Sequence, residues 1–148
     1  MPSGPLVGVN DWAKTLDAGL DTYLGAQFSG GRELSGGQWQ KLALARALAR
    51  EADLMVLDEP TAALDPESEA LLFRRLLDQK RADARTITVI VSHRLGFCPW
   101  ADWILVMDRG AVTQQGRHAE LLRQDGAYRV MFETQRALYG PIRSHSLY

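Results

Sequence analysis

The pattern of hydrophobic and polar positions predicts a chain in which strands and helices alternate. Three short runs rich in aliphatic and β-branched residues are typical of buried strands, and they lie at Asp53–Asp58, Thr86–Ser92 and Trp103–Asp108. Arg109-Gly110 follows the third run and predicts a turn into one more strand, Ala111–Gln115, which would complete a hairpin.

Helical spacing of apolar residues predicts helices between and after these runs. One helix runs from Ser35 to about Arg50, and Ser35 with Gln38 fits a capping box that satisfies backbone N–H groups of the first turn. Another begins at Asp65-Pro66, with Asp at the N-cap and Pro at the first helical position. The apolar residues of this second helix are Leu71, Leu72, Phe73 and Leu76. Shorter helices are predicted at Asp11–Ala18, Ala119–Arg123 and Tyr128–Leu138.

Strands that alternate with helices predict a mainly parallel sheet with helices packed on it, which is an α/β fold. In such sheets, ligands bind beyond the carboxyl ends of the strands. Asp58, Glu59, Ser92 and His93 all fall at these ends. The sequence therefore places its candidate chemistry at one edge of the predicted sheet.

Composition narrows the class of protein. A length of 148 residues suits one domain, and a hydrophobic content of 46% is ordinary for a globular core. The formal net charge of −1 gives no general attraction to nucleic acid or anionic membranes. Cys98 is the only cysteine, which excludes an internal disulfide and favours a reducing cytoplasm. No apolar run approaches the roughly 20 residues that span a bilayer, and the first residues do not resemble a signal peptide.

Two adjacent acids end the first predicted strand, in the run LMVLDE. Asp58 at this position could meet Mg²⁺, and Glu59, which points the other way in an extended chain, could orient or deprotonate an attacking water. The alternative is a strand that simply ends at a polar loop. His93 follows the next strand and could donate a hydrogen bond to a phosphate oxygen, or could be an ordinary capping or core residue.

The run LSGGQ at residues 34–38 opens a helix with two glycines. Backbone N–H groups at a helix N-terminus bind anions, helped by the helix dipole, and glycines leave them open to approach. The alternative is a flexible junction between a loop and a helix. The chain has no G-x-x-x-x-G-K-[ST] phosphate loop and no Gly-Lys dipeptide, so a phosphate at this helix would have to be held partly by other residues.

Four motifs in this order resemble those of the ATP-binding cassette ATPases of ABC transporters. LSGGQWQKLALARAL resembles their signature motif and signature helix, and LMVLDEP resembles Walker B followed by the catalytic Glu. Thr61–Asp65 (TAALD) resembles the D-loop, and Ser92–Leu95 (SHRL) resembles the H-loop. The later stretches ADWILVMDRG and GRHAELL are similar to the exporter-type cassettes. The resemblance covers roughly residues 19–138.

The resemblance implies a partial P-loop NTPase fold, a RecA-like three-layer sandwich with a mainly parallel sheet. Residues 1–50 would form an N-terminal arm and the remnant of the helical signature subdomain. Residues 51–138 would form the C-terminal half of the ATPase core, and residues 139–148 an irregular tail.

The resemblance also implies roles for single residues toward ATP and Mg²⁺. Asp58 would help to hold Mg²⁺ through water, Glu59 would be the general base toward the hydrolytic water, and His93 would contact the γ-phosphate. Asp65 of the D-loop would lie at a dimer interface. The residues that would contact ATP held by the opposing cassette are Ser35, Gly36 and Gly37, with Gln38 alongside.

Residues 1–33 contain no recognisable Walker A loop, adenine-stacking aromatic or Q-loop Gln. We therefore expect the C-terminal portion of an exporter ATPase, inactive alone and dependent on a Walker A-bearing half, a second cassette and a transmembrane domain at the cytoplasmic face of the membrane. In the family, the phosphate-loop strand lies between the strands that correspond to Thr86–Ser92 and Trp103–Asp108. Its absence predicts unpaired strand edges, an exposed apolar face and a marginally stable chain.

Other functions remain open at this point. A truncated cassette without catalysis could act as an interaction or regulatory partner of another cassette, or the chain could be a fragment without a function of its own. The C-terminal half of an SMC-type DNA-repair ATPase also pairs a signature with Walker B. Against that reading, residues 1–33 contain no heptad repeat and the net charge is not basic.

Overall fold

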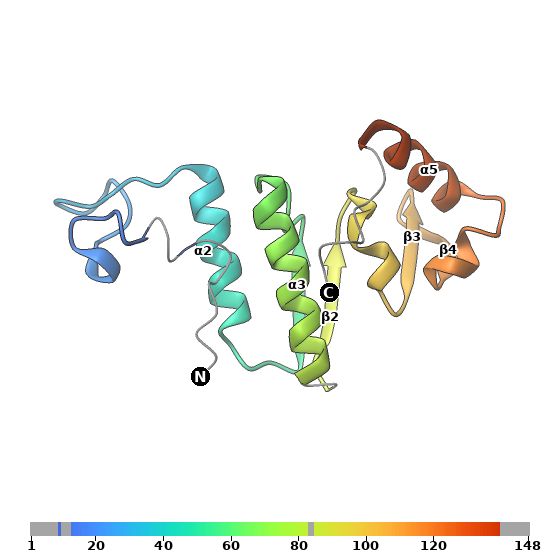
Figure 1. Cartoon of the computed structure of the whole chain (residues 1–148), viewed down its shortest axis with the longest axis horizontal. Helices are drawn as coiled ribbons and strands as arrows, with labels where there is room; N and C mark the ends of the chain where they lie inside the picture. Colours follow the sequence, from blue (N-terminus) through green and yellow to red (C-terminus); the bar gives the residue numbers. More distant parts are fainter. Residues whose placement is uncertain (1–8, 10–12, 83–84, 140–148) are drawn as a thin grey trace. The chain divides into compact units, whose positions relative to one another are not determined.

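The computed structural model describes residues 9, 13–82 and 85–139 (Figure 1). The chain divides into two compact units, Met1–Ser92 and His93–Tyr148. The first unit contains a 3₁₀ turn at Gly19–Asp21 and the elements α2 (Gly36–Leu48), β1 (Leu54–Asp58), α3 (Pro66–Ala82) and β2 (Ile87–Val91). The second contains a 3₁₀ helix at Leu95–Trp100 and the elements β3 (Ile104–Asp108), β4 (Ala111–Gly116), α4 (His118–Leu121) and α5 (Ala127–Tyr139).

The predicted strands and the α/β class are confirmed. β1 and β2 pair in parallel, with Val56 opposite Val89, while β3 and β4 form an antiparallel hairpin with an irregularity after Val106. Among the described residues, each pair is a two-stranded sheet of its own. The strand pair of the first unit is therefore parallel, and that of the second unit is antiparallel. The second pair is antiparallel because the turn at Arg109-Gly110 is too short for a parallel crossover.

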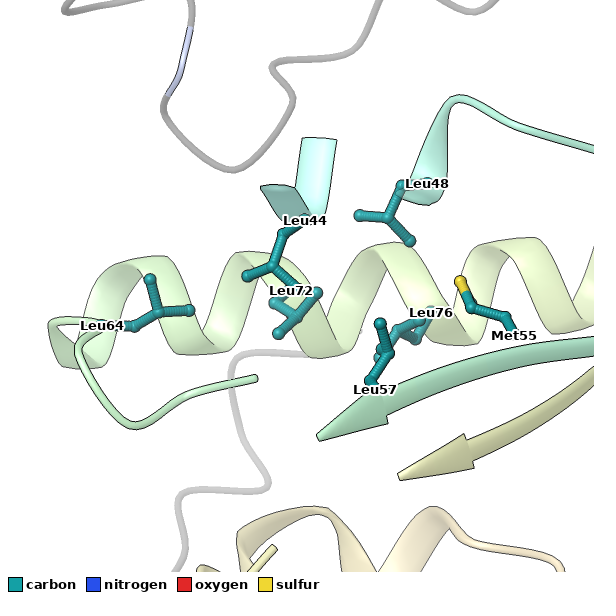
Figure 2. Packing of buried hydrophobic residues seen from close by; sticks show 7 residues of the cluster. All are labelled: Leu44, Leu48, Met55, Leu57, Leu64, Leu72 and Leu76. Carbon is teal, nitrogen blue, oxygen red and sulfur yellow. The ribbon is translucent and has the colours of Figure 1, made fainter. Parts of the chain in front are cut away.

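The core of the first unit lies between α2, α3 and one face of β1 (Figure 2). The strand alternates, with Met55 and Leu57 buried and Leu54 and Val56 exposed, as the two-residue period of a strand requires. The predicted α3 stripe is confirmed, since Leu72 is completely buried. The buried residues of the cluster are Leu44, Leu48, Met55, Leu57, Leu64, Leu72 and Leu76.

The opposite face of this strand pair is apolar and open to solvent, as the sequence predicted. Leu54 and Val56 on β1 have relative exposures of 57% and 59%, and the β2 residues in register with them are also apolar and exposed. The exposed β2 residues are Ile87, Val89 and Val91. An uncovered face of this kind is characteristic of a sheet that buries its second side against another part of a protein.

A second cluster forms the core of the second unit. It is made of Leu95, Val106, Leu121, Tyr128 and Phe132. The hydroxyl of the buried Tyr128 lies 2.6 Å from Nδ1 of His118, which gives the polar end of the ring a partner inside an apolar cluster.

Two sequence predictions differ from the structure, and one element was not predicted. Of the predicted helix at Asp11–Ala18, residues 11–12 lie outside the described residues and 14–18 form turns instead of helix. A reason is that residues 14–18 are mostly exposed, so no packed apolar face anchors a helix there. The predicted helix at Ala119–Arg123 is the single turn α4, and the 3₁₀ helix containing Pro99 was not predicted. The tail after Tyr139 lies outside the described residues.

No helix in the described part of the chain is both long and apolar enough to cross a membrane.

Candidate functional site

The N-terminus of α2 carries the first group of candidate residues. Ser35 is the N-cap, and the capping box is confirmed: Ser35 Oγ accepts from the Gln38 N–H at 3.3 Å, and the Ser35 N–H donates to Gln38 Oε1 at 2.9 Å. A hydroxyl that accepts the capping bond still has its own proton to donate. Ser35 and Gly36 are exposed. This helix start therefore presents backbone and hydroxyl donors to solvent, the arrangement that receives an anion.

The second group follows β1. Asp58 is its last residue and its side chain is exposed. Glu59 has a φ of +45°, in the left-handed region that few non-glycine residues adopt. Its N–H donates to the Val91 carbonyl at 2.8 Å, and Ser92 Oγ lies 3.4 Å from its Oε2. The left-handed conformation at Glu59 turns the chain out of the strand.

The turn after Glu59 packs directly on the start of α2. A Cβ placed on Gly37 would lie 3.1 Å from the Ala63 carbonyl oxygen, so glycine permits this close approach. Gln40, one turn further along α2, donates from Nε2 to the Glu59 carbonyl and accepts at Oε1 from the Ala63 N–H, both at 2.9 Å. The structure thus brings Gly37 of LSGGQ against the turn that follows Asp58 and Glu59.

Asp65 joins this group through two contacts. It caps α3 by accepting from the Ser68 N–H at 2.8 Å and the Ser68 hydroxyl at 2.7 Å, which confirms the predicted N-cap. Lys41 on α2 donates to the same carboxylate at 3.0 Å. The hydrogen bonds from Ser68, aided by the Lys41 ammonium, hold the pKa of Asp65 well below its usual range. Asp65 is therefore a fixed negative charge beside the helix start.

His93 is the first residue of the second unit, and its side chain is exposed. Its backbone carbonyl accepts a hydrogen bond from Gln135 Nε2 of α5, and Gln135 Oε1 accepts from the Leu95 N–H at 3.0 Å. One carboxamide thus fixes the backbone on both sides of Arg94. The role of His93 toward a phosphate stays a prediction.

Sequence reasoning missed Gln40 and Gln135, the two amides that hold the candidate loops. Each is a polar residue within an otherwise amphipathic helix, where a solvent-facing position is the ordinary interpretation. Nothing in the local pattern of either helix distinguishes them, because their partners are backbone groups that lie 19 to 42 residues away in the sequence.

The donor set at Asp58 fits Mg²⁺ in its chemistry. Magnesium prefers oxygen ligands and is commonly held by one or two carboxylates together with phosphates and water. Asp58 supplies one exposed carboxylate at the carboxyl end of a parallel strand. Within the described residues, no group of three or more His, Cys, Asp or Glu side chains could form a metal site by itself.

Comparison with known proteins gives one consistent family. The family described as "ABC transporter" matches residues 8–62. The subtilin transport ATP-binding protein SpaT of Bacillus subtilis is 47% identical over 116 residues, which are 78% of this chain and 18% of that protein. The ATP-dependent lipid A-core flippase of Vibrio cholerae is 45% identical over 125 residues, 84% of this chain and 20% of that protein.

A solved structure agrees with these relatives. The structure of a bacterial Atm1-family ABC exporter with ATP bound matches with a TM-score of 0.74 at 33% identity, over 87% of this chain and 22% of that chain. The chain described here thus spans about a fifth of the length of the relatives that it matches.

Proposed function

The chain belongs to the ATP-binding cassettes of ABC transporters, a family of nucleotide-binding domains, and on this premise we propose that it is the C-terminal portion of an exporter-type ATPase. In this proposal it contributes to ATP binding at an interface between two cassettes and couples hydrolysis to transmembrane export. It works at the cytoplasmic face of the membrane, with a Walker A-bearing segment, a second cassette and a transmembrane domain as partners.

One observation supports this proposal above the others. The open helix start at Ser35 and the acidic turn at Asp58-Glu59 belong to one packed unit, joined by the two bonds of Gln40 and the close approach of Gly37 to Ala63. An anion-binding helix start and a carboxylate pair are two of the parts that phosphoryl transfer uses. A strand that merely ended at a polar loop would need no such attachment.

The proposed roles follow from the chemistry of each group. The hydroxyl of Ser35 and the amides of Gly36 and Gly37 bind the γ-phosphate of ATP that another cassette holds, with Gln38 bracing the helix start through the capping box. Asp65 contributes a fixed charge at the same interface.

The remaining roles concern the reacting water and the phosphate. Glu59 accepts a proton from the attacking water, and His93 donates a hydrogen bond to the γ-phosphate. Asp58 holds Mg²⁺, which when bound neutralises developing charge on the phosphate oxygens. The residues of this chain orient the water and the phosphate, and supply the base.

The decisive experiment measures ATP hydrolysis by the chain alone and after addition of a Walker A-bearing N-terminal half. We expect no turnover from the chain alone, because Walker A amides and Lys supply most of the phosphate cradle in these enzymes. Turnover should appear with the added half and should fall by about 100-fold or more in Glu59→Gln, since a general base contributes about 10²–10⁴-fold.

Two outcomes would contradict the proposal. Strong hydrolysis by the chain alone would show that its phosphate cradle lies elsewhere. ATP-dependent association with the added half that is lost in Ser35→Arg, but without any hydrolysis, would instead support a non-catalytic partner of another cassette.

A further inference from the structure

Gln40 connects the signature helix to the turn that carries Glu59. It lies in the second turn of α2 and is partly buried. Its Nε2 donates to the carbonyl of Glu59 and its Oε1 accepts from the N–H of Ala63, each at 2.9 Å. A carbonyl can only accept and a backbone N–H can only donate, so these two partners determine which end of the amide faces which group.

The backbone that Gln40 binds is conformationally unfavourable. At a φ of +45°, Glu59 adopts a conformation that costs energy for a side chain with a Cβ and persists where surrounding contacts favour it. Two further contacts come from the strand pair and from the turn itself, since the Glu59 N–H donates to Val91 and its carbonyl accepts from Ala62 at 3.2 Å. Gln40 adds the contact from α2, so the conformation of Glu59 depends on where the helix lies.

The other polar residues at the start of α2 have different partners in the structure. Gln38 bonds to the backbone of Ser35 in the capping box, and Lys41 reaches past the turn to Asp65. Trp39 is exposed. Gln40 therefore has a task that neither neighbour duplicates, because its one planar amide spans both ends of the segment from Glu59 to Ala63.

We propose that Gln40 is a positioning residue for hydrolysis, which fixes the direction of the Glu59 carboxylate and makes it depend on the position of the signature helix. This inference rests on the proposed function, in which Glu59 is the general base and the start of α2 binds phosphate. When α2 binds the γ-phosphate of the ATP that the other cassette holds, any movement of the helix is transmitted to the Glu59 carbonyl through Gln40. The orientation of the base thus depends on whether that ATP is bound.

Two variants separate the two bonds of the amide. Gln40→Leu removes both, whereas Gln40→Glu keeps an acceptor for the Ala63 N–H and loses the donor to the Glu59 carbonyl. Arg46→Ala is the matched control, because Arg46 is an exposed residue on the same helix.

The first measurement is hydrogen exchange of the Ala63 amide in the full chain, which does not depend on ATP. Gln40→Leu should raise its exchange rate about tenfold, as expected for loss of one protecting hydrogen bond. Gln40→Glu and Arg46→Ala should leave it close to the original rate. An unchanged Ala63 exchange rate in a folded Gln40→Leu variant would overturn the inference. If that variant does not fold, an Ala63 exchange rate in Gln40→Glu as high as in the unfolded chain would overturn it.

The second measurement is steady-state ATP hydrolysis with the Walker A-bearing half supplied. Both Gln40 variants should lower kcat about five- to tenfold and leave KM for ATP unchanged, because Gln40 orients the base and does not bind the nucleotide. The kcat of Gln40→Glu should stay low between about pH 8 and about pH 6, because a carboxylate with the ordinary Glu pKa of about 4.3 remains ionised there and supplies no donor. A raised KM with unchanged kcat would overturn the inference.

The two measurements also separate this inference from the proposed function. If the original chain with the added half fails to hydrolyse ATP, the proposed function fails, and the assigned role in hydrolysis fails with it. The exchange rate of Ala63 then still decides whether Gln40 holds the turn. If hydrolysis is present and insensitive to both Gln40 variants, the function stands and the inference is wrong.

Discussion

Lys41 on the signature helix and Asp65 at the start of α3 form an ion pair, with 3.0 Å between the ammonium nitrogen and the carboxylate oxygen. The pair joins two helices that are separated in the sequence by a loop, a strand and a turn. Asp65 also caps α3 through Ser68. A single carboxylate therefore has both a local role in helix capping and a tertiary role in helix attachment.

Replacing Asp65 with Asn separates these two roles and changes the acid sensitivity of the first unit. Asn is also a good N-cap, so at pH 7 the loss should be small, within about 1 kcal/mol for an exposed pair. Because the folded state lowers the pKa of Asp65, its contribution is present above the unfolded pKa near 3.8 and is lost as the pH falls below it. The urea midpoint of the original chain should drop more steeply below pH 4 (about the Asp pKa) than that of Asp65→Asn. Equal slopes would contradict the assignment.

Leu72 is the completely buried residue on α3, and its truncation should be costly. Leu72→Ala removes methyl groups from the cluster in Figure 2 and should lower the free energy of unfolding by about 2–5 kcal/mol. Leu54→Ala is the control, because Leu54 is 57% exposed on the open face of β1, and its effect should stay within about 0.5 kcal/mol. Chemical denaturation of both variants measures the difference, and similar losses would show that Leu54 is covered in solution.

Thr61 is buried within the turn after Glu59, and its Oγ1 has no hydrogen-bond partner among the described residues. Thr61→Val has nearly the same shape and removes this unpaired hydroxyl, so it should leave the stability unchanged or raise it by about 1 kcal/mol. Thr113→Val is the comparison, since the hydroxyl of the exposed Thr113 donates to the Val106 carbonyl at 3.3 Å. Its effect should stay within about 0.5 kcal/mol, and a clearly larger loss in Thr61→Val would show that Thr61 has a partner in solution.

His118 should make the second unit sensitive to mild acid. Burial lowers its pKa from the ordinary value of 6.5, so the folded state favours the neutral ring. The unfolded chain takes up the proton first as the pH falls below 6.5, and stability is lost until the folded pKa is reached. His118→Gln should remove this loss. Unfolding midpoints at about pH 7.5 and 5.5 test it on either side of the ordinary His pKa, and an equal drop in the variant would refute it.

The elements of this protein could be predicted well because their signals are local. The capping box of Ser35 and Gln38, the Asp65-Pro66 helix start and the alternation in β1 each involve residues within a few positions of one another. The predicted helix at Asp11–Ala18 fails at 14–18 because capping and propensity do not sustain a helix without a packed apolar face. The predicted division at residues 50 and 138 stays a prediction, while the compact units divide after Ser92.

The sequence by itself determined which residue types could carry the chemistry: the glycines after Ser35, the acids Asp58 and Glu59, and His93 after a strand. It also determined the order of strands and helices, because the spacing of hydrophobic residues along the chain is a local property of the sequence. Only the tertiary structure decided that Gln40 holds the turn of Glu59, that Lys41 pairs with Asp65 and that one face of β1 and β2 stays open. The physical reason is that a contact with a distant backbone group leaves no trace in the local pattern, because it depends on how the chain closes in space.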